Sequence, residues 1–176
     1  MLEFLDKLIS PKYGDFTLEF NNGILCLSAL FMLIFGFQQI IDCRGTGSII
    51  NKYRKNWVLL ARLWFTATIL IIQFSLLIKI FKYNDWSNWF APSSIVNTLV
   101  VLGNLVAFVL SFYDFEVSEF TNGVLLSYWL WNCFINFFLL VHVLVRSYYK
   151  NIFVYGIENI GKYYFALLAL SSVNLL

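Results

Sequence analysis

Charge is scarce in this chain, and its scarcity excludes an ordinary soluble domain. Only 12% of the 176 residues are charged, against about 25% in an average soluble domain, whereas 60% are hydrophobic and 20% aromatic. These few charges cannot cover the surface of a soluble fold. The mean hydropathy of +0.75 and the long apolar blocks indicate a helical membrane protein. A net charge of +2 without a long basic stripe argues against a nucleic-acid partner.

Residues that carry out chemistry or bind metals are also few. His142 is the only histidine, so no pair of histidines is available for a metal. Cys26, Cys43 and Cys133 show no CxxC spacing, which favours inert thiols. The sequence has no phosphate-binding glycine loop, and its acidic residues lie outside the apolar blocks. We therefore predict that this segment is not an enzyme and holds no cofactor and no metal.

The apolar residues form five blocks, which predict an all-α integral membrane bundle of five transmembrane helices. A full crossing takes about 20 apolar residues. Four blocks meet that length, and they extend over residues 22–41, 57–78, 94–112 and 121–145. The fifth block begins near Tyr163 and is still running at Leu176. With about 14 residues it is shorter than a full span, which indicates a truncated fifth helix, either at the front of a longer chain or in a truncated reading frame.

Residues 1–20 are predicted to form a separate N-terminal segment ahead of the membrane domain at 21–176. Leu2, Leu5 and Ile9 recur at helical spacing, which predicts a short amphipathic helix at the membrane surface. A terminus without regular structure is the equally weighted alternative. Acidic residues near the start, where a signal peptide would carry positive charge, argue against a signal peptide.

Polar side chains inside the fourth block are candidates for specific contacts. Tyr128, Asn132 and Asn136 recur at every fourth residue and therefore share one helix face. A polar lining or a partner-binding seam is one interpretation. We favour hydrogen bonding between helices of the bundle, because no ionised group joins these three residues.

Small residues form a second candidate feature, on the third block. Gly103, Ala107 and Ser111 make a ridge at every fourth residue, which would let a neighbouring helix approach closely. The sequence does not say whether that neighbour belongs to the same chain.

Basic residues are densest just before the second block, in the stretch NKYRKNW at residues 51–57. They have three possible roles: to mark the cytoplasmic end of the second span, to attract anionic lipid at about 1 kcal/mol per basic residue, or to pair with the acidic stretch YDFEVSEF at residues 113–120. By parity of the spans, the two stretches lie on the same side of the membrane. The residues expected to act in interaction or topology are Arg44, Lys52, Arg54, Lys55, Trp57, Arg62, Asp114, Glu116 and Glu119.

The distribution of basic residues leaves the orientation open. The side that holds the N-terminus carries seven lysines and arginines, and the other side carries four, or five if Arg62 snorkels from the second span. This count leans weakly toward a cytoplasmic N-terminus, but the densest cluster lies on the other side.

Several stretches in register carry a resemblance to a known family. They are YGDFT at 13–17, NGILCLSALFMLIFG at 22–36, KYRKNW at 52–57 before a span with Arg62, NGVLLSYWLW at 122–131, and LVRSYY at 144–149. From about Tyr13 onward the chain resembles the N-terminal accessory transmembrane domain of C-subfamily ABC transporters, the multidrug-resistance-associated group. The likeness is strongest to the fungal vacuolar, cadmium-factor type.

That resemblance implies a five-helix accessory domain ahead of a transport core. It implies an N-terminus in the vacuolar lumen, with loops 43–56 and 113–120 cytoplasmic. The parent proteins use ATP and Mg to move glutathione conjugates and metal–glutathione complexes, while the accessory domain serves targeting, stability and regulation, in contact with lipid and the core. The alternative is a free-standing small membrane protein that binds and regulates another membrane protein.

Overall fold

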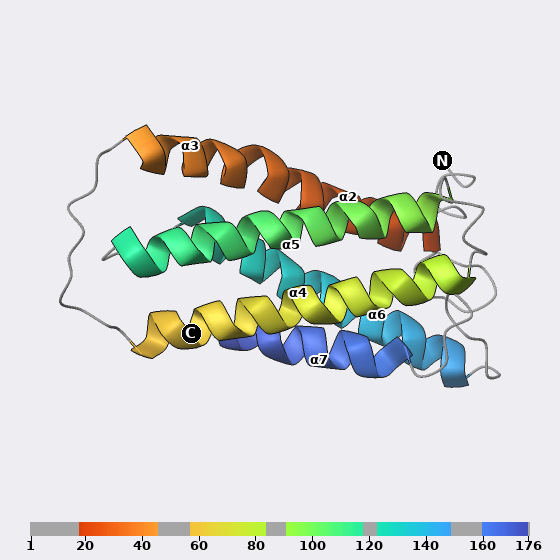
Figure 1. Ribbon diagram of the computed structural model, residues 1–176. Coiled ribbons are helices and arrows are strands. Elements are labelled where there is room, and N and C mark those ends of the chain that lie inside the picture. Colours follow the sequence, from red (N-terminus) through yellow and green to blue (C-terminus); the bar gives the residue numbers. More distant parts are fainter. Residues whose placement is uncertain (1–17, 46–56, 84–90, 118–122, 149–159, 176) are drawn as a thin grey trace, which may run out of the picture.

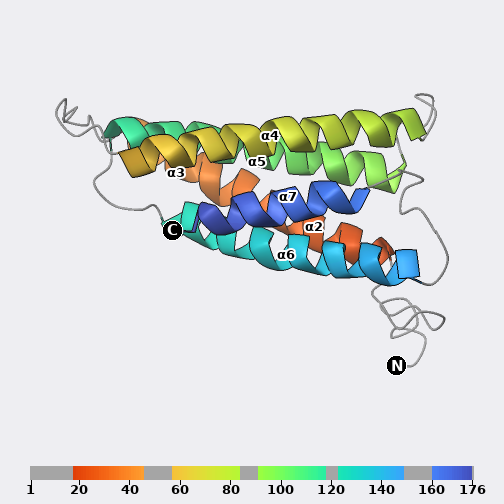
Figure 2. The same cartoon turned by 90° about the horizontal axis from the view of Figure 1, so that it is seen from below.

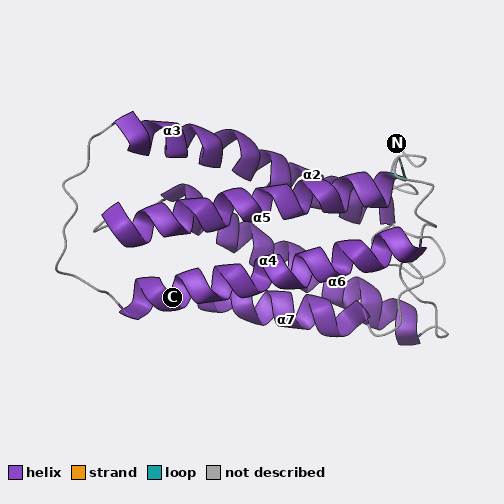
Figure 3. Ribbon diagram, in the orientation of Figure 1, coloured by secondary structure: helices purple, strands orange, loops and turns teal. Residues whose placement is uncertain are grey.

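The computed structural model describes residues 18–45, 57–83, 91–117, 123–148 and 160–175, and throughout these ranges the regular elements are helices (Figures 1 and 3). The elements are α2 Leu18–Phe31, the π-helix η1 Met32–Gly36, α3 Phe37–Gly45, α4 Trp57–Tyr83, α5 Pro92–Val117, α6 Gly123–Tyr148 and α7 Ile160–Val173. The predicted all-α membrane fold is confirmed. The predicted N-terminal amphipathic helix lies outside the described residues.

Four helical segments are long and apolar enough to cross a membrane. They are Glu19–Asp42, Trp57–Lys82, Pro92–Tyr113 and Gly123–Val145, and the first of them combines α2, η1 and α3. Each overlaps one of the four long blocks predicted from the sequence. The helix α7 is a fifth, shorter apolar helix.

The end of the fifth helix differs from the expectation that it runs to Leu176. The helix α7 begins at Ile160 and ends at Val173. A turn follows, in which the backbone N–H of Leu175 donates to the Ser172 carbonyl at 3.2 Å. The Asn174 side chain does not hold this turn by hydrogen bonding, because its Nδ2 and Oδ1 atoms are buried without a partner among the described residues.

The helices form a closed ring in the order α2, α5, α4, α7, α6 (Figures 1 and 2). Each helix packs against the next, and α6 returns to contact α2. The helices α3 and α5 end, and α4 and α6 begin, at the same end of the bundle (Figure 1). The ends that flank the basic and the acidic stretches therefore lie on one side, as span parity predicted.

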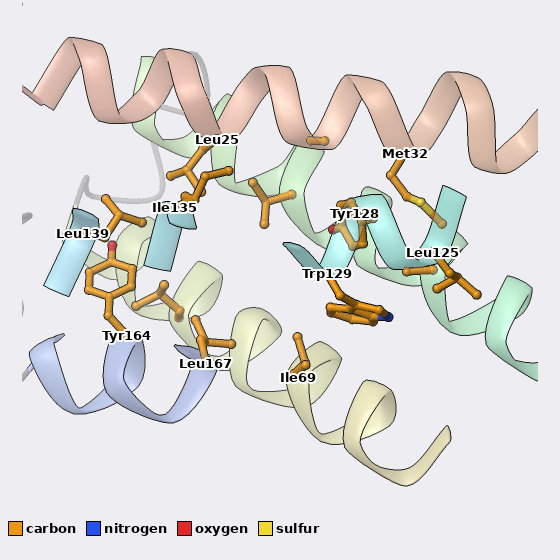
Figure 4. Close-up of a cluster of buried hydrophobic side chains, with 14 of the residues drawn as sticks. Leu25, Met32, Ile69, Leu125, Tyr128, Trp129, Ile135, Leu139, Tyr164 and Leu167 are labelled. Atoms are coloured by element: carbon orange, nitrogen blue, oxygen red, sulfur yellow. The ribbon is translucent and has the colours of Figure 1, made fainter. Parts of the chain in front are cut away.

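Apolar side chains from all sides of the ring fill its centre (Figure 4). The same residue types also cover the outside: Leu25 is 5% exposed, whereas Leu27 on the same helix is 70% exposed. Leucine suits both positions, because the solvent outside a membrane bundle is itself apolar.

The π-helix keeps the buried side of the first span in register. That buried stripe includes Asn21, Leu25, Ser28, Met32, Gly36 and Ile40. In an uninterrupted α-helix, Ile40 would point about 100° away from Asn21, because the two are 19 residues apart. The wider turn of η1 absorbs one residue and returns Ile40 to the core, where it is 7% exposed.

Candidate functional site

The junction of α2, α5 and α6 is built around Gly103 of α5. A Cβ atom at this position would lie 3.3 Å from the Ala29 Cα, 3.4 Å from the Ala29 carbonyl oxygen and 3.5 Å from the Tyr128 hydroxyl. The neighbour that approaches Gly103 is thus α2 of the same chain. Ala107 and Ser111 continue the buried face, and the Ser111 hydroxyl donates to the Ala107 carbonyl at 2.8 Å.

One hydrogen bond joins α6 to α5 at this junction. The Tyr128 hydroxyl donates to Asn104 Oδ1 at 3.1 Å, and both residues are 1% exposed. This is an interhelical bond of the kind expected from the polar face of the fourth span. Figure 4 shows Tyr128 inside the cluster of buried side chains.

The other two residues of that polar face behave differently from the expectation. Asn132 Nδ2 donates to the Tyr128 carbonyl at 2.9 Å, and Asn136 Nδ2 donates to the Asn132 carbonyl at 2.8 Å. Both bonds stay within α6, so the interhelical assignment is wrong for these two donors. The physical reason is distance: the carbonyl four residues earlier is always within reach of a short side chain, whereas a partner on another helix needs matching register.

Several buried polar residues were not predicted from the sequence. Asn97 is 4% exposed and donates to the Ser93 carbonyl at 2.8 Å, and Thr66 is fully buried. The spacing of Asn97 and Asn104, seven residues and hence nearly two turns, could have identified Asn97 as part of the same buried face. The buried polar atoms without a hydrogen-bond partner among the described residues include Asn104 Nδ2, Ser28 Oγ and Arg62 Nε.

The charged candidates are placed only in part. Lys52, Arg54, Lys55 and Glu119 lie outside the described residues. Arg44 belongs to α3, and Asp114 and Glu116 to α5, but their side chains are not described. Trp57 begins α4 and is 81% exposed, as a residue at a membrane interface would be, and Arg62, five residues later, is half-buried. The pairing between the basic and the acidic stretches stays a prediction.

The chemistry that the described residues can perform is therefore packing and hydrogen bonding. No group of three histidine, cysteine, aspartate or glutamate side chains within the described ranges could hold a metal ion. The contact between Cys133 Sγ and Ser172 Oγ, at 3.6 Å, is likewise a packing contact, which joins α6 to α7.

Comparisons with known proteins agree with this arrangement. The model of the ABC transporter TMD0 domain matches residues 7–157. Metal resistance protein YCF1 of Saccharomyces cerevisiae is 36% identical over 147 residues, which are 82% of this chain and 9% of the yeast protein. The chain thus spans about one-tenth of the length of that relative, and the match is to an accessory membrane domain, which is not the part of a transporter that hydrolyses ATP. The chain belongs to the TMD0 domain family of ABC transporters, as an N-terminal accessory membrane domain of the C-subfamily type.

Proposed function

We propose that this domain serves the targeting, stability and regulation of a fungal vacuolar exporter of glutathione conjugates and metal–glutathione complexes. The observation that carries the proposal is the family match together with a relative described as a metal resistance protein. In such an exporter, ATP and Mg act in the transport core, and this segment contributes no transport chemistry. Its partners are membrane lipid and the core.

The arrangement of side chains supports a packing role. Three polar side chains of α6 donate to Asn104 or to carbonyls of their own helix: Tyr128, Asn132 and Asn136. The outer surface of the spans is apolar, with Leu27, Ile34 and Trp131 each more than half exposed. Such a surface suits contact with lipid and with the spans of another membrane domain.

Orientation and charged contacts form part of the same proposal. The N-terminus faces the vacuolar lumen, and loops 43–56 and 113–120 face the cytoplasm. The basic stretch before α4, with Arg44, and the acids Asp114, Glu116 and Glu119 then complement each other on the cytoplasmic side.

A domain exchange tests the proposal. Yeast metal resistance protein YCF1 would be expressed with its matching segment replaced by this chain, beside the intact protein and a version that lacks the segment. We expect the chimera to reach the vacuolar membrane and to restore growth on cadmium to the level of the intact protein. Growth and location no better than those of the shortened version would overturn the proposal.

An immunoblot separates the domain from a free-standing protein. An antibody against residues 83–92, YNDWSNWFAP, would be applied to vacuolar membranes of the native organism. The proposal predicts a band several times larger than 20.6 kDa. A band near 20.6 kDa alone would favour the free-standing regulatory membrane protein.

A further inference from the structure

Arg62 stands at the end of the inward face of α4. That face continues through Thr66, Ile69, Gln73, Leu76 and Ile80, each at most 5% exposed. Arg62 and Ile80 are 18 residues apart, which is five full turns, so their Cβ atoms point in the same direction. Trp57 and Trp64 lie on the opposite, exposed side of the helix. Arg62 thus points toward the ring of helices, not directly outward as simple snorkelling would place it.

The guanidinium of Arg62 has an unpaired nitrogen among the described residues. Its Nε–H donor is buried and finds no acceptor there. The Thr66 hydroxyl donates to the Arg62 backbone carbonyl at 2.7 Å and does not contact the guanidinium. Residues 59–63 are all half-buried, whereas Thr66 is fully buried, so α4 emerges from the bundle at Arg62. Arg62 is itself only partly buried, so the residue keeps some exposed surface.

The depth of Arg62 places the guanidinium near lipid headgroups. Arg62 follows the exposed Trp57 by five residues, or about 7.5 Å along the helix axis. Side chains of a helix tilt toward its N-terminus, and the long arginine stem extends in that direction. The charge therefore returns to the level of Trp57, where an interfacial tryptophan marks the headgroup region.

We propose that Arg62 binds the phosphate of an anionic membrane lipid at the end of the bundle where α4 begins. A charge inside a span is unfavourable unless it is paired. The planar guanidinium presents two parallel N–H donors that match a phosphate. The helices that pack along α4 are α5 and α7, and the described side chains of these helices include no carboxylate. A lipid phosphate supplies the missing acceptor without unfolding the bundle.

Lipid binding by matched variants tests this site. The purified chain would be placed in phosphatidylcholine bicelles with a minor fraction of phosphatidic acid, and bound phosphatidic acid measured by native mass spectrometry. We expect Arg62→Gln to weaken binding about tenfold. Lys79→Gln removes the same charge from the other end of α4, where Lys79 lies 4.6 Å from the Tyr163 ring centre, and should leave binding unchanged. Equal loss in both variants, or none in Arg62→Gln, would overturn the proposal.

A measurement on the unsubstituted chain keeps the test valid if Arg62→Gln fails to fold. Solid-state NMR would detect dipolar coupling between ³¹P and the ¹³Cζ of Arg62, assigned apart from those of Arg44, Arg54 and Arg146. We expect a separation of about 4 Å for a bidentate contact. The coupling should belong to the phosphatidic acid signal. Coupling to added inorganic phosphate would assign the site to a free anion. If coupling to the lipid phosphate appeared only after the double substitution Asp114→Asn with Glu116→Gln, the native partner would be a carboxylate. Either result contradicts the lipid proposal.

Discussion

Gly103 brings two helices together because it has no side chain. Its Cβ position lies 3.3 Å from a backbone atom of Ala29, which cannot rotate away as a flexible side chain would. We expect Gly103→Leu to lower stability by about 1–3 kcal/mol through overpacking. Gly23→Leu is the matched control, because nothing lies within 4 Å of its Cβ position. Thermal unfolding in detergent, followed by size-exclusion chromatography, measures both, and equal effects would show that α2 does not approach Gly103.

The hydroxyl of Tyr128 makes the hydrogen bond that joins α6 to α5. Tyr128→Phe removes the donor to Asn104 Oδ1 and leaves the surrounding packing in place. We expect a loss of about 0.6 kcal/mol, and at most about 1.7 kcal/mol, as for other interhelical bonds in membranes. A double-mutant cycle with Asn104→Leu isolates the interaction energy of the Tyr128–Asn104 pair. The second substitution should lower the stability less when the first is already present. Fully additive effects would mean that the bond contributes nothing.

Among the elements, the π-helix η1 is a one-residue insertion whose removal should be tolerated. Deleting the exposed Ile34 brings Ile40 to 18 residues after Asn21, a whole number of turns, so a continuous α-helix keeps both in the core. Deleting Ile71 from α4 instead rotates Leu76 and Ile80 by about 100° and should cost on the order of 3 kcal/mol or more. Circular dichroism melts of the two deletion variants measure the difference. Comparable destabilisation would show that η1 is required for the fold.

The positions of the helices could be predicted from the sequence far better than their internal irregularities and side-chain contacts. Block length alone places the spans to within a few residues, because a bilayer of fixed thickness demands a minimum apolar length. The π-helix could not be predicted because its effect on the register is apparent only once the buried side of the span is known. The sequence does not distinguish the buried Leu25 from the exposed Leu27. The hydrogen-bond acceptors of Asn132 and Asn136 could not be predicted for a similar reason. Their spacing shows that they share a helix face, but it does not identify the group to which each side chain donates.

The arrangement of the whole molecule depends on which helices pack against each other, and the sequence alone does not show which of the possible helix pairs form. Small residues predicted a close approach at Gly103, but not that the partner would be α2 at Ala29. The ring order α2, α5, α4, α7, α6 separates the first span, which contains α2, from the next span in the chain, α4. Without a hydrophobic contrast between lipid and core, such neighbours are set by local fit and hydrogen bonding.

Orientation is the property of the whole molecule on which charge and family resemblance disagree. The lysine and arginine count leans toward a cytoplasmic N-terminus, whereas the family places it in the lumen. Single-cysteine variants test the orientation, with the natural cysteines replaced in each variant. One cysteine is placed at Gly45 or Val117, at one end of the bundle, or at Tyr83 or Ala91, at the other end.

Intact vacuoles, treated with a membrane-impermeant maleimide, expose only the cytoplasmic face to the reagent. We expect Gly45→Cys and Val117→Cys to react at once, and Tyr83→Cys and Ala91→Cys only after permeabilisation. The reverse pattern would refute the luminal N-terminus and leave the bundle intact. Different behaviour at positions 45 and 117 would instead contradict the bundle, because the structure places the ends of α3 and α5 together. The luminal orientation would mean that the dense cluster before α4, and not the total charge on each side, determines insertion.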